Sequence, residues 1–176
     1  MREILFRGKT IGSGEWAFGV LDNYKQRRLQ IIVNNGTIYG VRMAVDPDTV
    51  GQFTGLRDKN GKEIYEGDIL KVDEYSNESR QILDVKERKE VYDTFTLDEL
   101  KGRLMRSYIS PVNFENGSFC LSTYAPGDEG GMDLCLGCLF GDMKRSYPIF
   151  EFEVVGNIYD NKEIKLGRTF TADGCR

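Results

Sequence analysis

The sequence predicts a mainly β protein, in which antiparallel hairpins accompany a small barrel or strongly curved sheet and one amphipathic helix is inserted. Hairpins are predicted where Asn-Gly dipeptides at 35–36 and 116–117 separate runs of β-branched and aromatic residues. Asn-Gly accepts the positive φ angles that a tight hairpin turn requires. A further strand is predicted at residues 149–155, where apolar and acidic residues alternate and give one buried and one wet face.

The N-terminal part of the chain, residues 1–48, is expected to be a β region of its own. Its main element is a hairpin over residues 31–41, with Asn-Asn-Gly at 34–36 as the turn. The Asp-Pro-Asp sequence at 46–48 then interrupts the strand pattern, because proline has no amide hydrogen and restricts the residue before it. We therefore expect a boundary near residue 48.

Residues 49–166 are expected to form the barrel-like unit. Turn-forming residues at 58–61 and 66–68 precede a short strand at 69–72, and closely spaced strands joined by tight turns are typical of small barrels. The composition then becomes highly charged, with few turn-forming residues. We expect an insertion at about residues 73–110.

An amphipathic helix is expected inside this insertion. Residues 96–99 read Thr-Leu-Asp-Glu, a capping box in which the Thr and Glu side chains bond backbone amides at a helix start. Apolar residues then recur at helical spacing. The expected apolar face consists of Leu97, Leu100, Leu104, Met105 and Tyr108.

After the insertion, the pattern of strands and turns resumes. A second hairpin is predicted over residues 112–121, around the Asn-Gly turn. The glycine-rich residues 125–142 are expected to be a long loop, and the polar tail at 167–176 is expected to be frayed.

Composition limits the partners and the compartment of the protein. With a net charge of -4 and a pI near 5.1, the chain lacks the generally basic surface that binding along a nucleic-acid backbone needs. The basic run at 25–28 could still form a local patch, so a nucleic-acid-binding module remains an alternative. The N-terminus is charged from Arg2, and no stretch approaches the roughly 18 apolar residues of a spanning helix. We therefore expect a cytoplasmic protein without a membrane segment.

Few residues are candidates for chemistry. The chain has no histidine, which removes the commonest general base and metal ligand. Glu66 and Asp68 are the carboxylates best suited to a metal-dependent hydrolase, but Gly67 between them indicates a turn, in which an Asp bonds nearby backbone amides. The Gly-Ser-Gly sequence at 12–14 lacks the Lys-Ser/Thr ending of a phosphate loop and is interpreted as a turn. No catalytic residue is predicted, and Asp68 is expected to hold its turn together.

The four cysteines are expected to be thiols, because disulfides are rare in the cytoplasm. Cys135 and Cys138 have the spacing of half a zinc knuckle or of a redox pair. A four-ligand site would also need Cys120 and Cys175, and Cys175 is the second-last residue. We interpret Cys135 and Cys138 as small buried hydrophobes in a loop, and predict no metal or cofactor.

Residues 52–69 read QFTGLRDKNGKEIYEGDI and residues 154–159 read VVGNIY, and the N-terminal part contains Phe-Arg-Gly at 6–8 and Trp16. The two blocks resemble the signatures of the YopX family, and the N-terminal residues are similar to the N-terminal pattern of that family. The family occurs mainly in bacteriophages, prophages and their bacterial hosts. The resemblance implies an SH3-like barrel around residues 65–68 and a homo-oligomer, and it supplies no catalytic residues. The motif residues, all read as structural, are Gly55, Asp58, Gly61, Tyr65, Glu66, Gly67, Asp68, Gly156, Asn157 and Tyr159.

These observations together favour a non-enzymatic phage or prophage accessory protein that acts through contacts with other proteins as a homo-oligomer. The expected helix face and the sheet edges are the surfaces that a second copy, or a phage or host protein, would cover. Nucleic-acid binding by a small β-barrel surface is the first alternative. A carboxylate- and metal-dependent hydrolase is the second.

Overall fold

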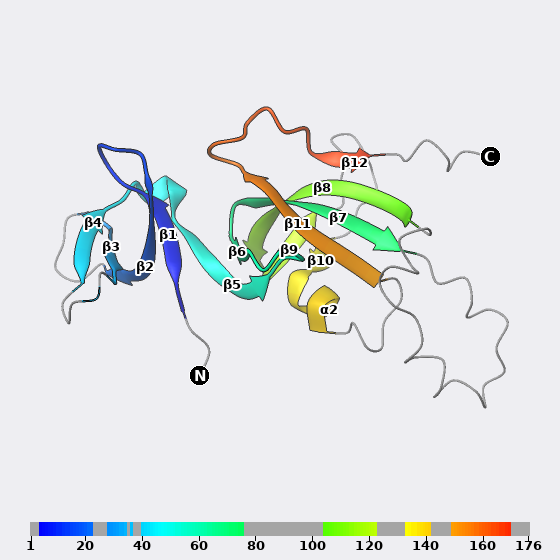
Figure 1. Cartoon of the computed structure of the whole chain (residues 1–176), viewed down its shortest axis with the longest axis horizontal. Helices are drawn as coiled ribbons and strands as arrows, with labels where there is room; N and C mark the ends of the chain where they lie inside the picture. Colours follow the sequence, from blue (N-terminus) through cyan, green and yellow to red (C-terminus); the bar gives the residue numbers. More distant parts are fainter. Residues whose placement is uncertain are drawn as a thin grey trace, which may run out of the picture.

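Two antiparallel β-sheets, each of six strands, form the described part of the protein in the computed structural model, and lie beside one another along its long axis (Figure 1). This confirms the mainly β prediction. The residues that the structure describes are 4–22, 28–34, 36, 40–75, 104–122, 133–141 and 149–169.

The first sheet is built from the N-terminal third of the chain. Its strands are β1 (Phe6–Lys9), β2 (Trp16–Asp22), β3 (Gln30–Val33), β4 (Val41–Ala44), β5 (Gly51–Arg57) and β6 (Glu63–Tyr65), with a 3-10 helix, η1 (Pro47–Thr49), before β5. They are ordered β4-β3-β2-β1-β5-β6.

This sheet curls so that β1 and β4 approach each other at one end. Thr10 and Val45 form an antiparallel bridge just beyond the two strands, and the Ile11 N–H donates to the Ala44 carbonyl at 2.9 Å. The curl encloses a small apolar cluster with Ala17, Ile31 and Val45 at its centre.

The second sheet holds the larger core. Its strands are β7 (Asp68–Tyr75), β8 (Leu104–Glu115), β9 (Ser118–Ser122), β10 (Asp133–Cys135), β11 (Ile149–Asn157) and β12 (Gly167–Thr169), and a short helix, α2 (Leu136–Gly141), follows β10. The strand order is β10-β9-β8-β7-β11, with β12 also paired to β8. The core consists of Ile64, Leu70, Val72, Tyr108, Val112, Phe119, Leu121, Leu136 and Phe152.

Both predicted hairpins are present. In β8–β9, Asn116 and Gly117 form the turn with φ angles of 52° and 81°, as their sequence predicts. β3 and β4 also pair, but Val33 pairs with Val41, so residues 34–40 connect the strands in place of the predicted turn at 34–36; residues 35 and 37–39 lie outside the described residues. The predicted alternation in β11 is also found, because Phe150, Phe152 and Val154 contact the core of the second sheet.

The expected helix is wrong for the residues that the structure describes. Leu104 to Tyr108 belong to β8, where Leu104 pairs with Tyr75 and Tyr108 with Val72 of β7. Pairing with β7 and burial of Tyr108 outweigh the local helical spacing, because strand formation depends on neighbours that are distant in sequence. The capping box and the other helical residues, 96–103, lie outside the described residues.

The expected loop over residues 125–142 contains regular structure. Asp133 to Cys135 form β10 on the edge of β9, and α2 follows directly. The reason is burial of two leucines between the glycines: Leu134 contacts the core, and Leu136 is fully buried. In the part of the chain that the structure describes, no helix is long and apolar enough to cross a membrane.

The described strands follow two open paths and form no closed barrel, so the SH3-like barrel is not confirmed. The turn after Tyr65 sends the chain from β6 in the first sheet to β7 in the second, instead of closing one sheet on itself. The first sheet also runs across residue 48, because β5 and β6 belong to it. At the other end, β12 pairs with β8 in the region expected to be a frayed tail.

Candidate functional site

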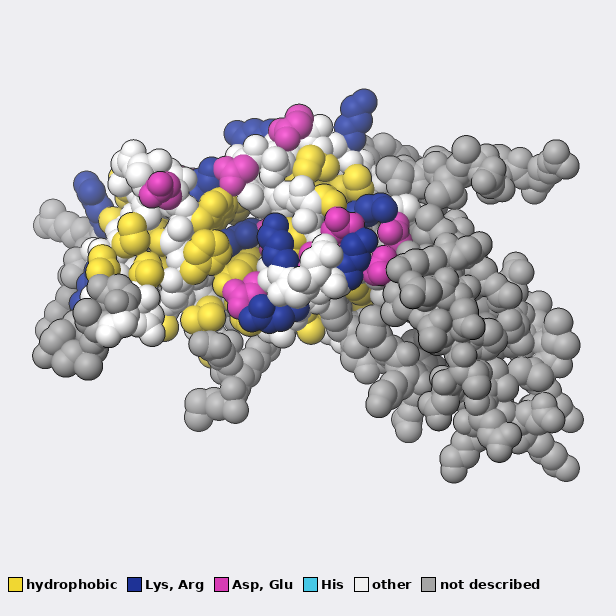
Figure 2. All heavy atoms as spheres, in the orientation of Figure 1, with side chains coloured by type: hydrophobic (Ala, Val, Ile, Leu, Met, Phe, Trp, Pro, Cys, Tyr) yellow, Lys and Arg dark blue, Asp and Glu magenta, His cyan; other side chains and the backbone are white. Residues whose placement is uncertain are grey.

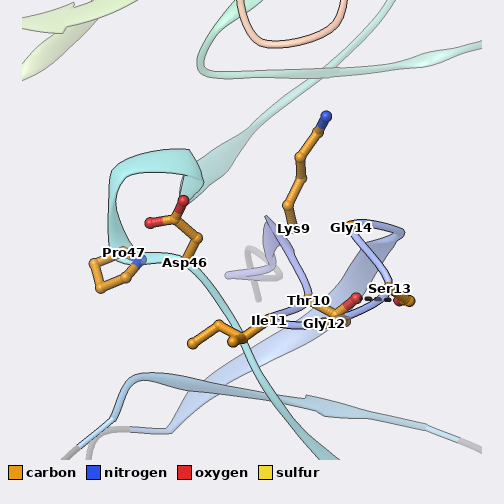
Figure 3. Close-up of a pocket in the computed structure, with 8 residues that line it drawn as sticks. All are labelled: Lys9, Thr10, Ile11, Gly12, Ser13, Gly14, Asp46 and Pro47. Atoms are coloured by element: carbon orange, nitrogen blue, oxygen red, sulfur yellow. Dashed lines mark hydrogen bonds between the residues drawn. The ribbon is translucent and has the colours of Figure 1, made fainter.

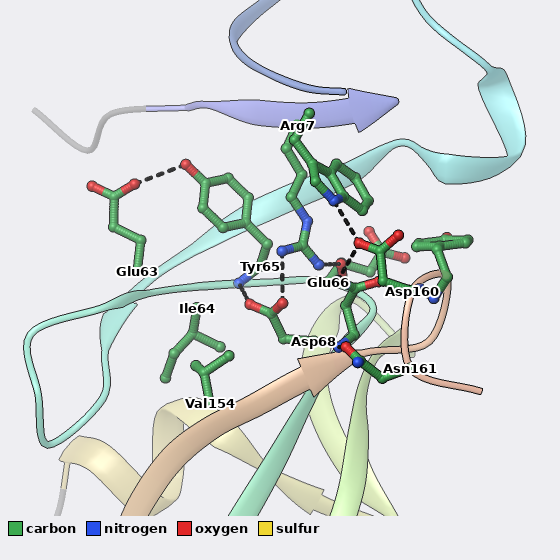
Figure 4. A network of polar contacts seen from close by, with 12 residues as sticks. Arg7, Glu63, Ile64, Tyr65, Glu66, Asp68, Val154, Asp160 and Asn161 are labelled. Atoms are coloured by element: carbon green, nitrogen blue, oxygen red, sulfur yellow. Dashed lines mark hydrogen bonds and ion pairs between the residues drawn. The ribbon is translucent and has the colours of Figure 1, made fainter. Parts of the chain in front are cut away.

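The two sheets meet at an ion pair between Arg7 in β1 and Asp68 at the start of β7 (Figure 4). The Arg7 Nη1 and Asp68 Oδ1 atoms lie 2.6 Å apart, and only 8% and 2% of the two side chains are exposed. Arg7 Nη2 also donates to the Glu66 carbonyl at 3.1 Å. One side chain of the first sheet therefore binds both the carboxylate and the backbone of the turn that enters the second sheet.

Asp68 holds the same turn from inside. Its Oδ2 atom accepts the backbone N–H of Tyr65 at 2.8 Å, so both carboxylate oxygens are engaged within the chain. Burial raises the pKa of Asp68 above its ordinary value, although the positive charge of Arg7 acts in the opposite direction. Asp68 thus lies where the sequence predicts a brace of the turn.

Gly67 lets the backbone of the turn contact β8 and the turn that follows β11. Its N–H donates to the Val112 carbonyl at 2.8 Å, and its carbonyl accepts the N–H of Ile158 at 2.9 Å. Its φ angle is +80°, and a Cβ atom at this position would lie 3.1 Å from the Tyr159 ring. A glycine adopts this conformation without strain, whereas a side chain here would be strained and would press on the Tyr159 ring.

Aromatic rings cover the guanidinium of Arg7. Its Cζ atom lies 4.6 Å from the centre of the Trp16 ring and 5.1 Å from that of Tyr65, both distances at which cation–π attraction operates. The Tyr65 hydroxyl donates to Glu63 at 2.8 Å. Burial, together with the bond to Glu63, raises the pKa of the Tyr65 hydroxyl. These contacts keep the rings in place around the buried charge.

Asp160, directly after the second signature, connects the turn after β11 to the first sheet. Asn157 Oδ1 accepts the backbone N–H groups of Tyr159 and Asp160, at 3.0 and 2.9 Å, and so shapes the turn after β11. Asp160 then accepts the Trp16 indole N–H at 2.8 Å and pairs with Lys9. The hydrogen bond from Lys9, followed by those from Asn157 and Trp16, lowers the pKa of Asp160 to about 2.

We call this set of contacts the intersheet joint, defined by Arg7, Trp16, Tyr65, Asp68 and Asp160. It combines the N-terminal pattern with the first signature and with Asp160, the residue that directly follows the second signature, and these are far apart in the sequence. Gly156 lies beside it, where a Cβ atom would fall 2.6 Å from Asn161 Oδ1.

A second connection is made by Asp58, in the turn between β5 and β6. Oδ1 accepts the N–H groups of Asn60 and Lys62, at 2.8 and 2.9 Å, while Oδ2 accepts the N–H of Val154 in β11 at 3.0 Å. Burial alone would raise the pKa of Asp58, but the bonds from Val154, Lys62 and Asn60 together lower it. Asp58 therefore forms its own turn and also binds the edge of the second sheet.

The remaining motif residues lie close to this turn or contribute through their backbones. Gly61 has a φ of +81° in the Asp58 turn, and Gly55 has a φ of +85° where the β5–β6 pairing is irregular. Lys59 donates its N–H to the Phe152 carbonyl at 3.0 Å, and its ammonium lies 2.8 Å from Glu153. The hydrogen bond with Glu153 is the main cause of the raised pKa of Lys59.

Glu66 and Asp68 do not act as a pair. The Glu66 carboxylate lies 3.5 Å from the backbone N–H of Gln52, whereas Asp68 binds Arg7 and Tyr65. Among the described residues, no three or more Cys, Asp or Glu side chains gather as they would around a metal ion. Cys120 and Cys135 are half-buried, while the Cys138 side chain and Cys175 lie outside the described residues.

A pocket of about 570 Å³ lies at the Gly-Ser-Gly turn after β1 (Figure 3). Thr10 Oγ1 and Ser13 Oγ lie 2.6 Å apart, and the Gly14 N–H donates to the Thr10 carbonyl at 3.0 Å. This is the turn that the sequence predicts. Lys9 lines the pocket but pairs with Asp160, and Asp46 brings a negative charge to the same wall, so the pocket does not favour an anion.

The sequence did not identify Arg7, Lys9 and Asp160 as partners in one site. Arg7 and Trp16 belong to the N-terminal pattern noted above, but their contacts with Asp68 and Asp160 depend on how the two sheets are placed. The sequence signal is an arginine directly after the apolar residues Ile4, Leu5 and Phe6, because an arginine that is buried in a sheet requires an acidic partner.

The comparison with protein families matches most of the chain. A family model described as "YopX protein" matches residues 15–164. No curated protein matches the chain.

Proposed function

Because the chain belongs to the YopX protein family, we propose that it is a non-enzymatic phage or prophage accessory protein that acts through protein contacts as a homo-oligomer. The observation that carries this proposal is that two carboxylates of the family motif are buried and bonded within the chain. Asp58 and Asp68 are 7% and 2% exposed, and each of their oxygens is bonded within the chain. A catalytic carboxylate must reach its substrate, whereas these two connect the sheets.

The proposed contact surface is an apolar face of β2. Phe18 and Val20 lie two residues apart on the same face of the strand and are 48% and 53% exposed. Ile32, the Cα partner of Val20 in β3, is half-buried on that face. Figure 2 shows hydrophobic side chains gathered over the first sheet. Exposed apolar side chains that cluster on a sheet mark interaction surfaces.

From the sequence, an apolar helix face was expected to mediate self-association. The apolar face of β2 takes that role in this proposal. Leu104, which was expected to contribute to that helix face, belongs to β8 instead. A second copy is the partner we propose, because one copy offers the other the same face and a two-fold axis can bury both at once.

Neither alternative function gains support from the described residues. The basic run that prompted the nucleic-acid hypothesis lies outside them except for Arg28, which is exposed. Arg7, Lys9 and Lys59 are each paired with acidic side chains. The hydrolase hypothesis requires converging carboxylates, and Glu66 and Asp68 make separate contacts.

Light scattering during size-exclusion chromatography tests the proposal. The native protein is expected to elute as a multiple of 20.1 kDa, and Val20→Glu is expected to shift it to the single-chain mass. Ile11→Glu is the matched control, because Ile11 is 52% exposed but lies in the turn after β1, away from the β2 face. A native mass of 20.1 kDa over a wide concentration range would refute the oligomer. Equal effects of the two variants would refute the β2 face.

A further inference from the structure

Three Asn-Gly dipeptides occur in the chain, at 35–36, 60–61 and 116–117, and the second and third lie wholly within the described residues. An asparagine side chain can react with the backbone that follows it, because the next backbone nitrogen can attack the side-chain carbonyl carbon and close a five-membered ring. Glycine hinders this attack least, since it has no side chain. The attacking N–H must be free, so the fold decides which dipeptide reacts.

The turn between β8 and β9 leaves this nitrogen free. The strands pair as far as Glu115 and Ser118, so Asn116 and Gly117 alone form the turn, and both are exposed. Within the described part of the chain, neither the Gly117 N–H nor the Asn116 side chain has a hydrogen-bond partner. A Cβ atom added to Gly117 would meet no neighbour within 4 Å. Nothing there obstructs ring closure.

The turn between β5 and β6 offers a matched comparison. Asn60 and Gly61 are also exposed, and the φ angle of Gly61 is +81°, the same as that of Gly117. The Gly61 N–H, however, donates to the Asp58 carbonyl at 2.9 Å, and the Asn60 N–H donates to Asp58 Oδ1 at 2.8 Å. The two dipeptides therefore differ in whether the attacking nitrogen is bonded, while their exposure and their sequence are alike.

The bonded turn is also held by the second sheet. Asp58 is 7% exposed, and its Oδ2 atom accepts the N–H of Val154 in β11 at 3.0 Å. Releasing the Gly61 nitrogen therefore disturbs a turn that is bonded to β11. The β8–β9 turn has no comparable bond to Asn116 or Gly117 among the described residues.

We propose that Asn116 is a modification site, at which the chain deamidates spontaneously to aspartate and isoaspartate. The Gly117 nitrogen loses its proton to a base in the solvent and bonds to the side-chain carbonyl carbon of Asn116. The side-chain nitrogen leaves as ammonia. Water then opens the ring at either of its two carbonyls, which yields aspartate or isoaspartate. The net reaction consumes water and releases ammonia, with no oxidation or reduction.

Either product changes the hairpin. Aspartate places a negative charge beside Glu115, and isoaspartate adds a methylene group to the main chain of the turn. The pairing of Glu115 with Ser118 continues to Phe119, which belongs to the larger core. Loop length sets the register of a hairpin, so the longer main chain of isoaspartate is expected to weaken this pairing. The inference does not depend on the proposed oligomer.

Peptide mapping of the full chain tests the site. The folded protein is incubated in mildly alkaline buffer and digested at mildly acidic pH with a protease that cleaves after glutamate. Mass spectrometry with fragmentation then gives the modified fraction at each asparagine. Asn116 is expected to react about tenfold faster than Asn60, a ratio that corresponds to about 1.4 kcal/mol in the barrier and to the opening of one or two hydrogen bonds.

Two controls separate the fold from the sequence. In urea both turns are lost, so the two rates are expected to converge. Asn116→Gly keeps a residue suited to the positive φ but removes the side-chain amide, so it is expected to abolish the reaction in the hairpin and leave the Asn60 rate unchanged. Equal rates in the folded chain, a faster reaction at Asn60, no reaction at Asn116, or a tenfold difference that survives in urea would each overturn the proposal.

Discussion

Arg7 and Asp68 lie 2.6 Å apart and almost fully out of water, although one belongs to the first sheet and the other begins the second. An ion pair in this position adds a polar connection between two sheets that also share apolar packing, because Ile64 of β6 belongs to the larger core. Removing two charges from water is costly, so such a pair stabilises the fold only when both members are present. The intersheet joint is therefore expected to respond strongly to loss of one partner.

Asp68→Ala is expected to lower the free energy of unfolding by about 3–5 kcal/mol, because it leaves the Arg7 charge buried and unpaired. Total stabilities are typically about 5–15 kcal/mol, so the loss should be plain in urea denaturation. Asp48→Ala, at an exposed carboxylate, is the control and should change little. The Arg7→Met/Asp68→Leu double variant should lose less than the two single changes combined. An unaltered midpoint for Asp68→Ala would contradict the role of the joint.

Gly67→Ala is expected to destabilise the protein more than Gly61→Ala does. The two glycines have φ angles of +80° and +81°, so both variants carry the same backbone strain of about 1–2 kcal/mol. Only at Gly67 does the added Cβ meet a neighbour, the Tyr159 ring at 3.1 Å. The difference between the two denaturation midpoints measures that contact. Equal losses would show that the ring moves aside freely.

Stability is expected to fall in acid partly through Asp160. Its pKa is lowered from 3.8 to about 2 in the folded protein, so its contribution is complete above pH 3.8 and is lost as the pH falls toward 2. Asp160→Asn keeps a side chain of the same shape without the charge. The stability difference between the native protein and this variant should therefore be constant near neutrality and shrink between about pH 4 and 2. A difference that does not change with pH would show that the Asp160 charge contributes nothing.

The elements that could be predicted are those whose cause is local. Asn116-Gly117 and the Asp58 turn follow from the backbone preferences of their own residues, and the alternation in β11 follows from one buried face. Tyr108 shows where prediction from local sequence fails. Its spacing from other apolar residues suits a helix, but it pairs with Val72 of β7 in a strand. Leu136 is a second failure of this kind. The glycines around it indicate a loop, but Leu136 is buried in the core and begins a short helix.

The candidate site could be predicted only in part, for the same reason. The chemistry of Asp68 and Gly67 predicts a turn, and in the structure Asp68 accepts the Tyr65 N–H across that turn. The partnership of Arg7 with Asp68, and of Lys9 with Asp160, depends on the placement of one sheet against the other. A single sequence contains no record of which distant charges meet.

The pairing of Tyr75 with Leu104 means that the chain leaves and re-enters the second sheet at one point. Because the two ends are already held together, the connection between them can change in length at small cost, about 0.6 kcal/mol for each doubling. Tyr75 is the last residue of β7, whereas Asp68, which belongs to the intersheet joint, is the first. The connection therefore starts at the end of the strand that is opposite to the joint. It is thus a natural insertion point for a fused reporter domain, through which the protein could be followed in cells while both sheets keep their contacts.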